Sequence, residues 1–363
     1  MAEHVLVVGA GLIGAGVARA LARGGARVTV VEAGVPASLA SGRSFGWINA
    51  SFFLNEDHFR LRLAGMAAHR RLEAALPGTG HRWSGCFWWE DQGAGFDRMA
   101  AELIRLGYAV EEVTCRWLAG REPALALLPD RALWFPDEGA VDPAHLARVL
   151  LADAAAAGAL VLTGCPVLGL VRRGDAVAGV RTAQGVIAAD RVVLATGVAT
   201  AGLLAAERIA FPMLRRPGAM VRTQALPPVL SAILASDGPE VRQEASGHIL
   251  CPTSAAHQGD TAEAITTPPA ELAAATIARL RAMFPGLDLR LHSLMMAERP
   301  VPGDGLPAVG PVPGLAGLWM AVLHSGVTLG PLVAEGLAAE MLEGRVLPEW
   351  APFRPDRLIS RGS

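Results

Sequence analysis

Three glycines between an apolar strand and a helix constrain the fold of this chain more than any other feature. They are Gly9, Gly11 and Gly14. The apolar run 4–8 before them predicts a parallel strand that is buried on both faces, residues 12–23 predict a helix, and residues 27–31 predict a second strand. Because strand, helix and strand follow one another without a break, the sequence predicts an α/β fold that begins with a β-α-β unit.

Each glycine has a physical role in a nucleotide-binding turn. The first permits the tight turn, the second lets the backbone approach a pyrophosphate at the helix N-terminus, and the third lets the helix pack on the strand. Glu32 ends the second strand, where it can accept hydrogen bonds from both ribose hydroxyls and disfavours the 2′-phosphate of NADP. The alternative is a buried glycine turn without a ligand. Strand, helix and acid in register favour a dinucleotide, either FAD or NAD.

Composition excludes several classes of protein. The 363 residues indicate two domains, and a net charge of -2 argues against a nucleic-acid partner. Hydrophobic content of 52% is typical of a globular protein, and no apolar stretch predicts a membrane span. All 32 basic residues are arginines, so Schiff-base lysine chemistry and a P-loop lysine are excluded. The start of the chain does not resemble an export signal, so we expect a reducing cytoplasm.

The four cysteines form no C-x-x-C pair, which argues against a redox motif or a metal site. We expect them to be buried free thiols. Residues 38–49 form a Ser/Gly/Arg loop whose donors suit a second phosphate or a flavin edge, although a solvated loop is the alternative. Residues 57–76 predict a helix with Arg62 among the charged residues outside its apolar side, and 86–89 predict a core strand.

Further elements are expected along the rest of the chain. Strands are predicted at 160–162, 167–171, 177–182, 191–194, 219–226, 240–242, 248–251, 287–298 and 318–323, and helices at 142–157 and 269–284. The strand that ends at Leu194 runs into Ala195-Thr196-Gly197. Residues 324–331 open a last helix to Leu342, whose free N–H groups suit an electron-rich flavin carbonyl. An ordinary helix start capped by Ser325 or Thr328 is the alternative.

Taken together, these motifs resemble those of the flavin-dependent D-amino-acid oxidase superfamily, which includes glycine oxidase, sarcosine oxidases and amino-acid dehydrogenases. The resemblance spans the chain and is carried by residues 7–14 with Glu32, 193–197, 216–218, Arg299-Pro300 with 304–307, and 324–326. It selects FAD over NAD. It also implies a Rossmann-like FAD-binding domain (1–80, 140–215 and 299–363) and an interleaved α+β substrate domain on a mostly antiparallel sheet (81–139 and 216–298).

The resemblance also implies site residues. The ADP portion would contact the three glycines and Glu32, and the adenine would contact the backbone of Val167. Residues 41–45 would contact the pyrophosphate and the flavin. Residues 324–330 would line the isoalloxazine ring. The cofactor-binding residues implied are Gly9, Gly11, Leu12, Ile13, Gly14, Glu32, Ala33, Ser41, Gly42, Arg43, Ser44, Phe45, Val167, Ala195, Thr196, Gly197, Arg299, Ser325, Gly326, Val327, Thr328 and Leu329.

Arg299 and His324 are the implied catalytic residues. The arginine of the Arg-Pro element would bind the substrate carboxylate bidentately; the alternative is a domain-interface ion pair with Glu298 or Asp304. His324, His248, His257 and His58 are candidates to take the proton of the substrate amine.

The implied reaction is oxidation of the C–N bond of an amino acid or N-alkyl amino acid to an imine, by hydride transfer to flavin N5. Sarcosine oxidases hold flavin through a cysteine near the Arg-Pro element and use a lysine to activate oxygen. Here Cys251 lies well upstream and lysine is absent, so we expect noncovalent FAD and leave oxygen, a quinone or a carrier protein open as acceptor. The rivals are a subunit of a heteromeric opine or hydroxyproline-type dehydrogenase, a non-catalytic cofactor-binding scaffold and, with less support, a flavin monooxygenase.

Overall fold

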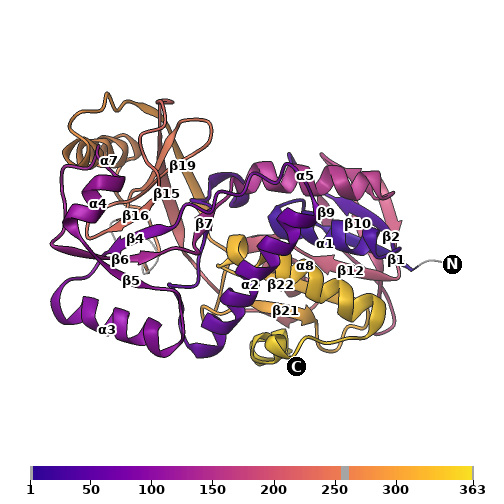
Figure 1. Cartoon of the computed structure of the whole chain (residues 1–363). Helices are drawn as coiled ribbons and strands as arrows, with labels where there is room; N and C mark the ends of the chain where they lie inside the picture. Colours follow the sequence, from indigo (N-terminus) through magenta and orange to yellow (C-terminus); the bar gives the residue numbers. More distant parts are fainter. Residues whose placement is uncertain (1–2, 255–260, 362–363) are drawn as a thin grey trace.

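A six-stranded sheet forms the centre of the lobe that contains both β1 and the last long helix, α8 (Figure 1). The computed structural model describes residues 3–254 and 261–361. The strand order is β21-β22-β12-β1-β2-β8, and every neighbouring pair is parallel except β21 with β22. The strands are β1 (His4–Val8), β2 (Arg27–Val31), β8 (Leu160–Leu162), β12 (Arg191–Leu194), β21 (Ala308–Pro311) and β22 (Leu318–Val322). The predicted β-α-β unit and parallel sheet are confirmed.

Helices cover one face of this sheet and a small antiparallel sheet covers the other. Helix α1 (Leu12–Arg23) packs between α5 (Pro143–Ala156) and α8 (Gly326–Glu343), and α2 (Glu56–Ala75) packs on α8. The small sheet consists of β9 (Val167–Arg173), β10 (Ala176–Thr182) and β11 (Gly185–Ala188). Along β1, Val5 and Val7 belong to the core on the helix side, whereas Leu6 and Val8 belong to the core shared with the small sheet. This alternation is the pleat of a strand that is buried on both faces.

The second lobe is built on an eight-stranded sheet with the order β19-β15-β18-β17-β16-β4-β6-β5. Only β16 and β4 pair in parallel, so the predicted mostly antiparallel sheet is confirmed. The strands are β4 (Cys86–Trp89), β5 (Glu111–Thr114), β6 (Arg131–Phe135), β15 (Pro217–Thr223), β16 (Ile233–Ser236), β17 (Glu240–Gln243), β18 (Ile249–Pro252) and β19 (Leu291–Glu298). Helices α3 (Gly93–Arg105), α4 (Cys115–Arg121) and α7 (Pro269–Met283) belong to this lobe (Figure 1).

Short elements connect the two lobes and close the chain. The two-stranded pairs are β3 (Trp47–Ile48) with β7 (Gly139–Ala140), β13 (Ile209–Ala210) with β23 (Ser360–Arg361), and β14 (Met213–Leu214) with β20 (Val301–Pro302). One further α-helix is α6 (Thr200–Ala205), and the 3-10 helices are Ser41–Arg43, Gly197–Ala199, Pro348–Phe353 and Pro355–Arg357. Over residues 3–254 and 261–361, none of the helices has both the length and the apolar character that crossing a bilayer requires.

One expectation about burial is wrong. Cys115, at the start of α4, is exposed, while the other three cysteines are buried. Arg62, which lies outside the apolar side of α2, is nevertheless only 3% exposed. The reason is that α2 is covered on two sides, because α8 packs over a face that the apolar periodicity does not mark. The core strand at Cys86–Trp89 is confirmed, since all four residues are buried.

Candidate cofactor and active site

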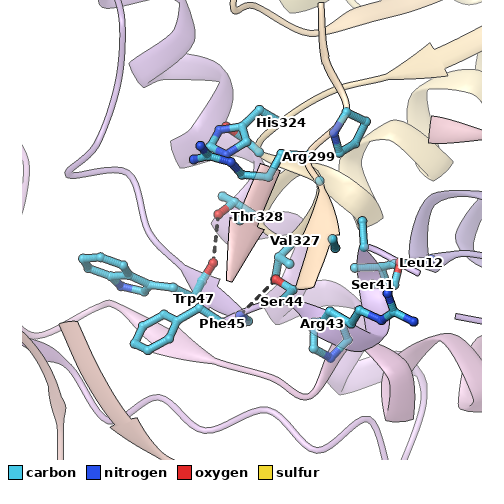
Figure 2. Close-up of a pocket in the computed structure, with 18 of the residues that line it drawn as sticks. Leu12, Ser41, Arg43, Ser44, Phe45, Trp47, Arg299, His324, Val327 and Thr328 are labelled. Carbon is cyan, nitrogen blue, oxygen red and sulfur yellow. Dashed lines mark hydrogen bonds between the residues drawn. The ribbon is translucent and has the colours of Figure 1, made fainter. Parts of the chain in front are cut away.

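Two adjoining cavities run from the carboxyl ends of the parallel strands to the gap between the two sheets. The first cavity has an empty volume of about 1530 Å³, part of it open to solvent, and is lined by Gly9, Glu32, Val167 and Gly197 among others. The second has about 1110 Å³ and is lined by Phe45, Met220, Arg299 and His324 among others (Figure 2). The cavities share six lining residues, which are Leu12, Ile13, Ala40, Ser41, Pro300 and Leu323. One elongated ligand could therefore occupy both.

The glycine turn makes the floor of the first cavity. Gly9 has a φ of +99°, and a Cβ atom there would lie 2.5 Å from the carbonyl oxygen of Ala195. A Cβ atom at Gly14 would lie 1.9 Å from the carbonyl oxygen of Gly9, so this glycine packs α1 against the turn and does not line the cavity. Side chains at either position would push the turn away from its neighbours, as expected of a close-packed nucleotide turn.

Glu32 is held by two backbone amides at the edge of the first cavity. Its Oε2 accepts from Ala10 N at 2.8 Å and its Oε1 from Gly34 N at 2.9 Å. A carboxylate has about four acceptor positions, so these two bonds orient Glu32 and leave capacity for two ribose hydroxyls.

Two helix N-termini face the cavities. In the first turn of α1, Leu12 N donates to Ser41 Oγ at 3.0 Å, and the other first-turn amides have no side-chain acceptor among the described residues. Gly11 at the start of α1 and Ser325 at the start of α8 make no capping hydrogen bond within their helices. The first-turn amides and the helix dipoles therefore present positive charge at both ends of the ligand path. An anionic pyrophosphate suits the α1 end and an electron-rich ring carbonyl the α8 end. The glycine floor, the oriented Glu32 and these two helix ends fit an adenine dinucleotide that carries a ring system.

The second cavity is electropositive. Arg43, Arg62, Arg299 and His324 line it, and no aspartate or glutamate of the described residues does. Arg43 is exposed and donates to the carbonyl oxygen of Met296 at 2.6 Å. Such a lining favours an anionic substrate group.

Arg299 is anchored to the edge of the eight-stranded sheet. Its backbone N–H and its Nε both donate to the carbonyl oxygen of Arg216, at 2.9 and 3.2 Å. The two acids considered as alternative partners each have another arginine beside them: Asp304 lies 2.8 Å from Arg357, and Glu298 lies 3.8 Å from Arg215.

Ser325 is oriented by two donors from α2. His58 Nδ1 accepts from Leu54 N at 3.3 Å, so His58 Nε2 carries the hydrogen and donates to Ser325 Oγ at 3.2 Å. Arg62 Nη1 donates to the same oxygen. Since a hydroxyl has two acceptor positions and one donor, both acceptor positions are filled and the O–H group of Ser325 is left as a donor.

The charge state of both α2 side chains follows from burial. Burial, followed by the charges of Arg62 and His324, lowers the pKa of His58 to about 3, so His58 is neutral at physiological pH. Burial also lowers the pKa of Arg62 to about 10, with Glu138 opposing the shift, so Arg62 stays charged. Arg62 Nε donates to the carbonyl oxygen of Asn49 at 3.1 Å and Nη2 to its side-chain oxygen.

The structure brings most of the predicted site residues to the two cavities. Those lining the first are Gly9, Gly11, Leu12, Ile13, Glu32, Ala33, Ser41, Val167, Ala195, Thr196 and Gly197. Those lining the second are Leu12, Ile13, Ser41, Arg43, Ser44, Phe45, Arg299, His324, Ser325, Gly326, Val327 and Thr328 (Figure 2). Three predicted residues line neither cavity, namely Gly14, Gly42 and Leu329. Leu329 is fully buried in the core, and a Cβ atom at Gly42 would lie 2.3 Å from the carbonyl oxygen of Ala37.

Of the candidate histidines, His58 and His324 lie close enough to interact electrostatically. His248 bonds to the carbonyl oxygen of Thr223 and lines neither cavity, and His257 lies outside the described residues. Sequence reasoning missed Arg62 and Met220, whereas Trp47 and Asn49 belong to the loop 38–49 that was proposed as a whole. A usable signal for Arg62 was the polar series His58, Arg62 and His69, which recurs at helical spacing along α2.

Comparisons with known proteins agree with this geometry. The family model described as "FAD dependent oxidoreductase" matches residues 4–341. A glycine oxidase from Pseudomonas aeruginosa is 29% identical over 98% of this chain and 99% of its own length. The crystal structure of glycine oxidase from Bacillus cereus has a TM-score of 0.84 and 22% identity, covering 99% of both chains. L-proline dehydrogenase from P. horikoshii has a TM-score of 0.86 and 22% identity, covering 98% of this chain and 97% of its own.

Proposed function

Because the chain belongs to the family of FAD-dependent oxidoreductases, we propose that it oxidises the C–N bond of an amino acid or N-alkyl amino acid to an imine. The observation that carries this proposal is the meeting of Arg299 and His324 in a second cavity with no acidic lining residue among those described. The likeness to a glycine oxidase along nearly the whole chain supports an amino acid as substrate class. Bound FAD supplies the hydride acceptor, flavin N5, and water hydrolyses the imine.

Arg299 binds the substrate carboxylate in this proposal. Its planar guanidinium can form two parallel charge-assisted bonds to a carboxylate, and the bonds to Arg216 fix its direction. Phe45, Trp47 and Met220 contribute apolar walls that exclude water. The substrate is thereby held in one orientation in a site of low dielectric, which is the protein's main contribution to this chemistry.

The amine of the substrate has to lose its proton before it reacts. His324 lines the second cavity and is the histidine that we assign to hold this proton. His58 serves a different role, because both of its ring nitrogens are engaged, one by Leu54 and one by Ser325. It orients the hydroxyl of Ser325 as a donor toward the ligand.

FAD is proposed to bind without a covalent bond to cysteine, since none of the four cysteines lines either cavity. All four are free thiols, which supports a reducing cytoplasmic location. The electron acceptor is oxygen, a quinone or a carrier protein.

The test is anaerobic bleaching of the bound flavin across D-, L- and N-alkyl amino acids, followed by admission of air to establish whether oxygen reoxidises it. Arg299→Met should keep the yellow cofactor and lower kcat/KM by at least about 100-fold, because two charge-assisted bonds are lost. Arg215→Met is the matched control, since Arg215 is 72% exposed and should leave turnover unchanged. No bleaching by any amino acid, or full activity of Arg299→Met, would contradict the proposal.

A further inference from the structure

Helix α8 lacks one hydrogen bond in the turn that lines the second cavity. Pro331 lies inside this helix and has no N–H group. In a regular α-helix the amide of residue 331 would donate to the carbonyl oxygen of Val327, which lines the second cavity. Val327 is half-buried, and a carbonyl without a donor is unfavourable there, so a donor from another element is favoured.

A histidine from α2 supplies it. His69 Nε2 lies 2.7 Å from the carbonyl oxygen of Val327, and His69 is fully buried. On the other side of the ring, His69 Nδ1 lies 2.7 Å from His81 Nε2, and His81 Nδ1 lies 2.8 Å from Thr79 Oγ1. The three side chains form one continuous chain of hydrogen bonds that ends on the α8 backbone.

The acceptor at the end of this chain determines every proton in it. A carbonyl oxygen only accepts, so His69 Nε2 carries the hydrogen and His69 Nδ1 is an acceptor. His81 Nε2 must then donate to it, which leaves His81 Nδ1 to accept from the hydroxyl of Thr79. Both rings are neutral in this arrangement, in keeping with burial, which lowers the pKa of His69 to about 3 and also lowers that of His81.

The rest of the same α2 face contacts the same turn. His58 and Arg62 both donate to Ser325 Oγ, as described above. A Cβ atom at Gly65 would lie 2.6 Å from the carbonyl oxygen of Thr328. Residues 58, 62, 65 and 69 follow one another at helical spacing, so one face of α2 holds the turn 325–328 at four successive points.

We propose that His69 is a positioning residue: it replaces the missing Pro331 amide and fixes the peptide of Val327 in the turn that faces the flavin ring. His81 and Thr79 keep His69 in the tautomer that donates to Val327. The inference rests on the cofactor site described above. It predicts that the hydrogen bond, and not the bulk of the imidazole, determines the geometry of this turn.

The test is a double-mutant cycle on the flavin-loaded protein with His69→Leu, Pro331→Ala and both together. Residue 331 regains an amide in the alanine variant, so His69 becomes dispensable there. His69→Leu alone should weaken FAD binding about tenfold and shift the visible flavin absorption band, because the carbonyl of Val327 loses its donor. The FAD dissociation constant of the double variant should lie within about twofold of that of Pro331→Ala. The flavin spectra of these two variants should be the same.

Two further variants keep the test decisive. His81 stacks on Trp83 with 5.7 Å between the ring centroids, and His81→Phe retains a flat ring there but removes control of the His69 tautomer. Pro331→Ala should restore FAD binding and the flavin spectrum of this variant in the same way. This cycle remains informative even where His69→Leu does not fold. His248→Leu is the matched control, because it removes a histidine-to-carbonyl bond of the same 2.7 Å length outside the cavities and should leave the flavin spectrum unchanged.

The inference would be overturned if the His69 and His81 substitutions weakened FAD binding equally in proteins with Pro331 and with Ala at that position. FAD affinity and the flavin spectrum do not depend on which substrate is oxidised, so this outcome is distinguishable from a failure of the proposed amino-acid oxidation. If the proposed amino-acid oxidation were wrong, amino acids would not bleach the flavin, but Pro331→Ala would still restore FAD binding in the His69 and His81 variants.

Discussion

At the scale of single residues, Arg62 has more influence on the site than its position in a charged helix implies. It is buried, and its guanidinium donates to three oxygens on Asn49 and Ser325. We predict that Arg62→Met lowers the free energy of unfolding by about 3 kcal/mol, because these acceptors stay buried without their donor. Arg60→Met should change it by less than about 0.5 kcal/mol, since Arg60 is exposed and its ion pair with Glu56 is at the surface. Urea denaturation measures both, and similar losses in the two variants would contradict the prediction.

His58 predicts a pH dependence of stability with a definite sign. Its pKa is about 3 in the folded protein and 6.5 ordinarily, so the unfolded chain takes up a proton that the folded chain does not. The stability due to neutral His58 is fully present above pH 6.5 and decreases as pH falls toward 3. Between pH 6.5 and 5 the wild type should lose about 2 kcal/mol relative to His58→Gln, which retains a donor to Ser325. Denaturation curves of both proteins at several pH values test this; a constant difference would contradict it.

At the scale of elements, the contact of α2 with α8 depends on the absence of a side chain at Gly65. Alanine usually stabilises a helix relative to glycine by about 0.5–1 kcal/mol, but a Cβ atom here would lie 2.6 Å from Thr328 O. Gly65→Ala should therefore destabilise the protein by about 1–2 kcal/mol and weaken FAD binding. Gly120→Ala, in α4 with open space around it, should stabilise instead. Thermal unfolding distinguishes the two, and a stabilised Gly65→Ala would show that the helices separate freely.

Most long elements were predictable because their signals are local. The β-α-β unit, α5 and α7 carry their own periodicity and their own start and stop residues. The elements that were not predicted include the helices α3, α4 and α6 and the strands β5, β6, β11, β16 and β21. Strand β5 has three exposed residues in four, so it lacks the apolar alternation on which such predictions depend.

At the scale of the whole molecule, the cavities proposed to bind FAD are lined by residues of both lobes, so FAD binding should couple to global stability. Saturation at a hundredfold excess over the dissociation constant should stabilise the protein by about 2.7 kcal/mol, and Glu32→Leu should reduce this gain by weakening ribose binding. NADPH should give no comparable gain in stability.

Acid precipitation of the flavin-loaded protein should leave the yellow colour in the supernatant, because no cysteine lines the cavities. Colour that stays in the pellet would contradict noncovalent binding.

The domain boundaries remain a prediction. The FAD-binding domain is predicted to comprise residues 1–80, 140–215 and 299–363, and the substrate domain residues 81–139 and 216–298. Arg299 was proposed for the site from the family resemblance, and the strand pairings show how the fold brings its motif beside residues 216–218. It follows β19, whose Glu298 pairs with Pro217 of β15, so the two arginine-containing motifs lie next to each other in space. Arg299 donates to the carbonyl oxygen of Arg216 although 83 positions separate the two residues in the chain.

The sequence alone determined the nucleotide turn, the acid at the end of β2 and the class of fold, because each depends on residues that are neighbours in the chain. Only the tertiary structure decided that Arg62 is buried, that His58 and Arg62 together orient Ser325, and that His69 takes the place of an amide that Pro331 cannot provide. Those contacts join residues about 260 positions apart, and periodicity within one helix cannot indicate which other helix will cover its polar side.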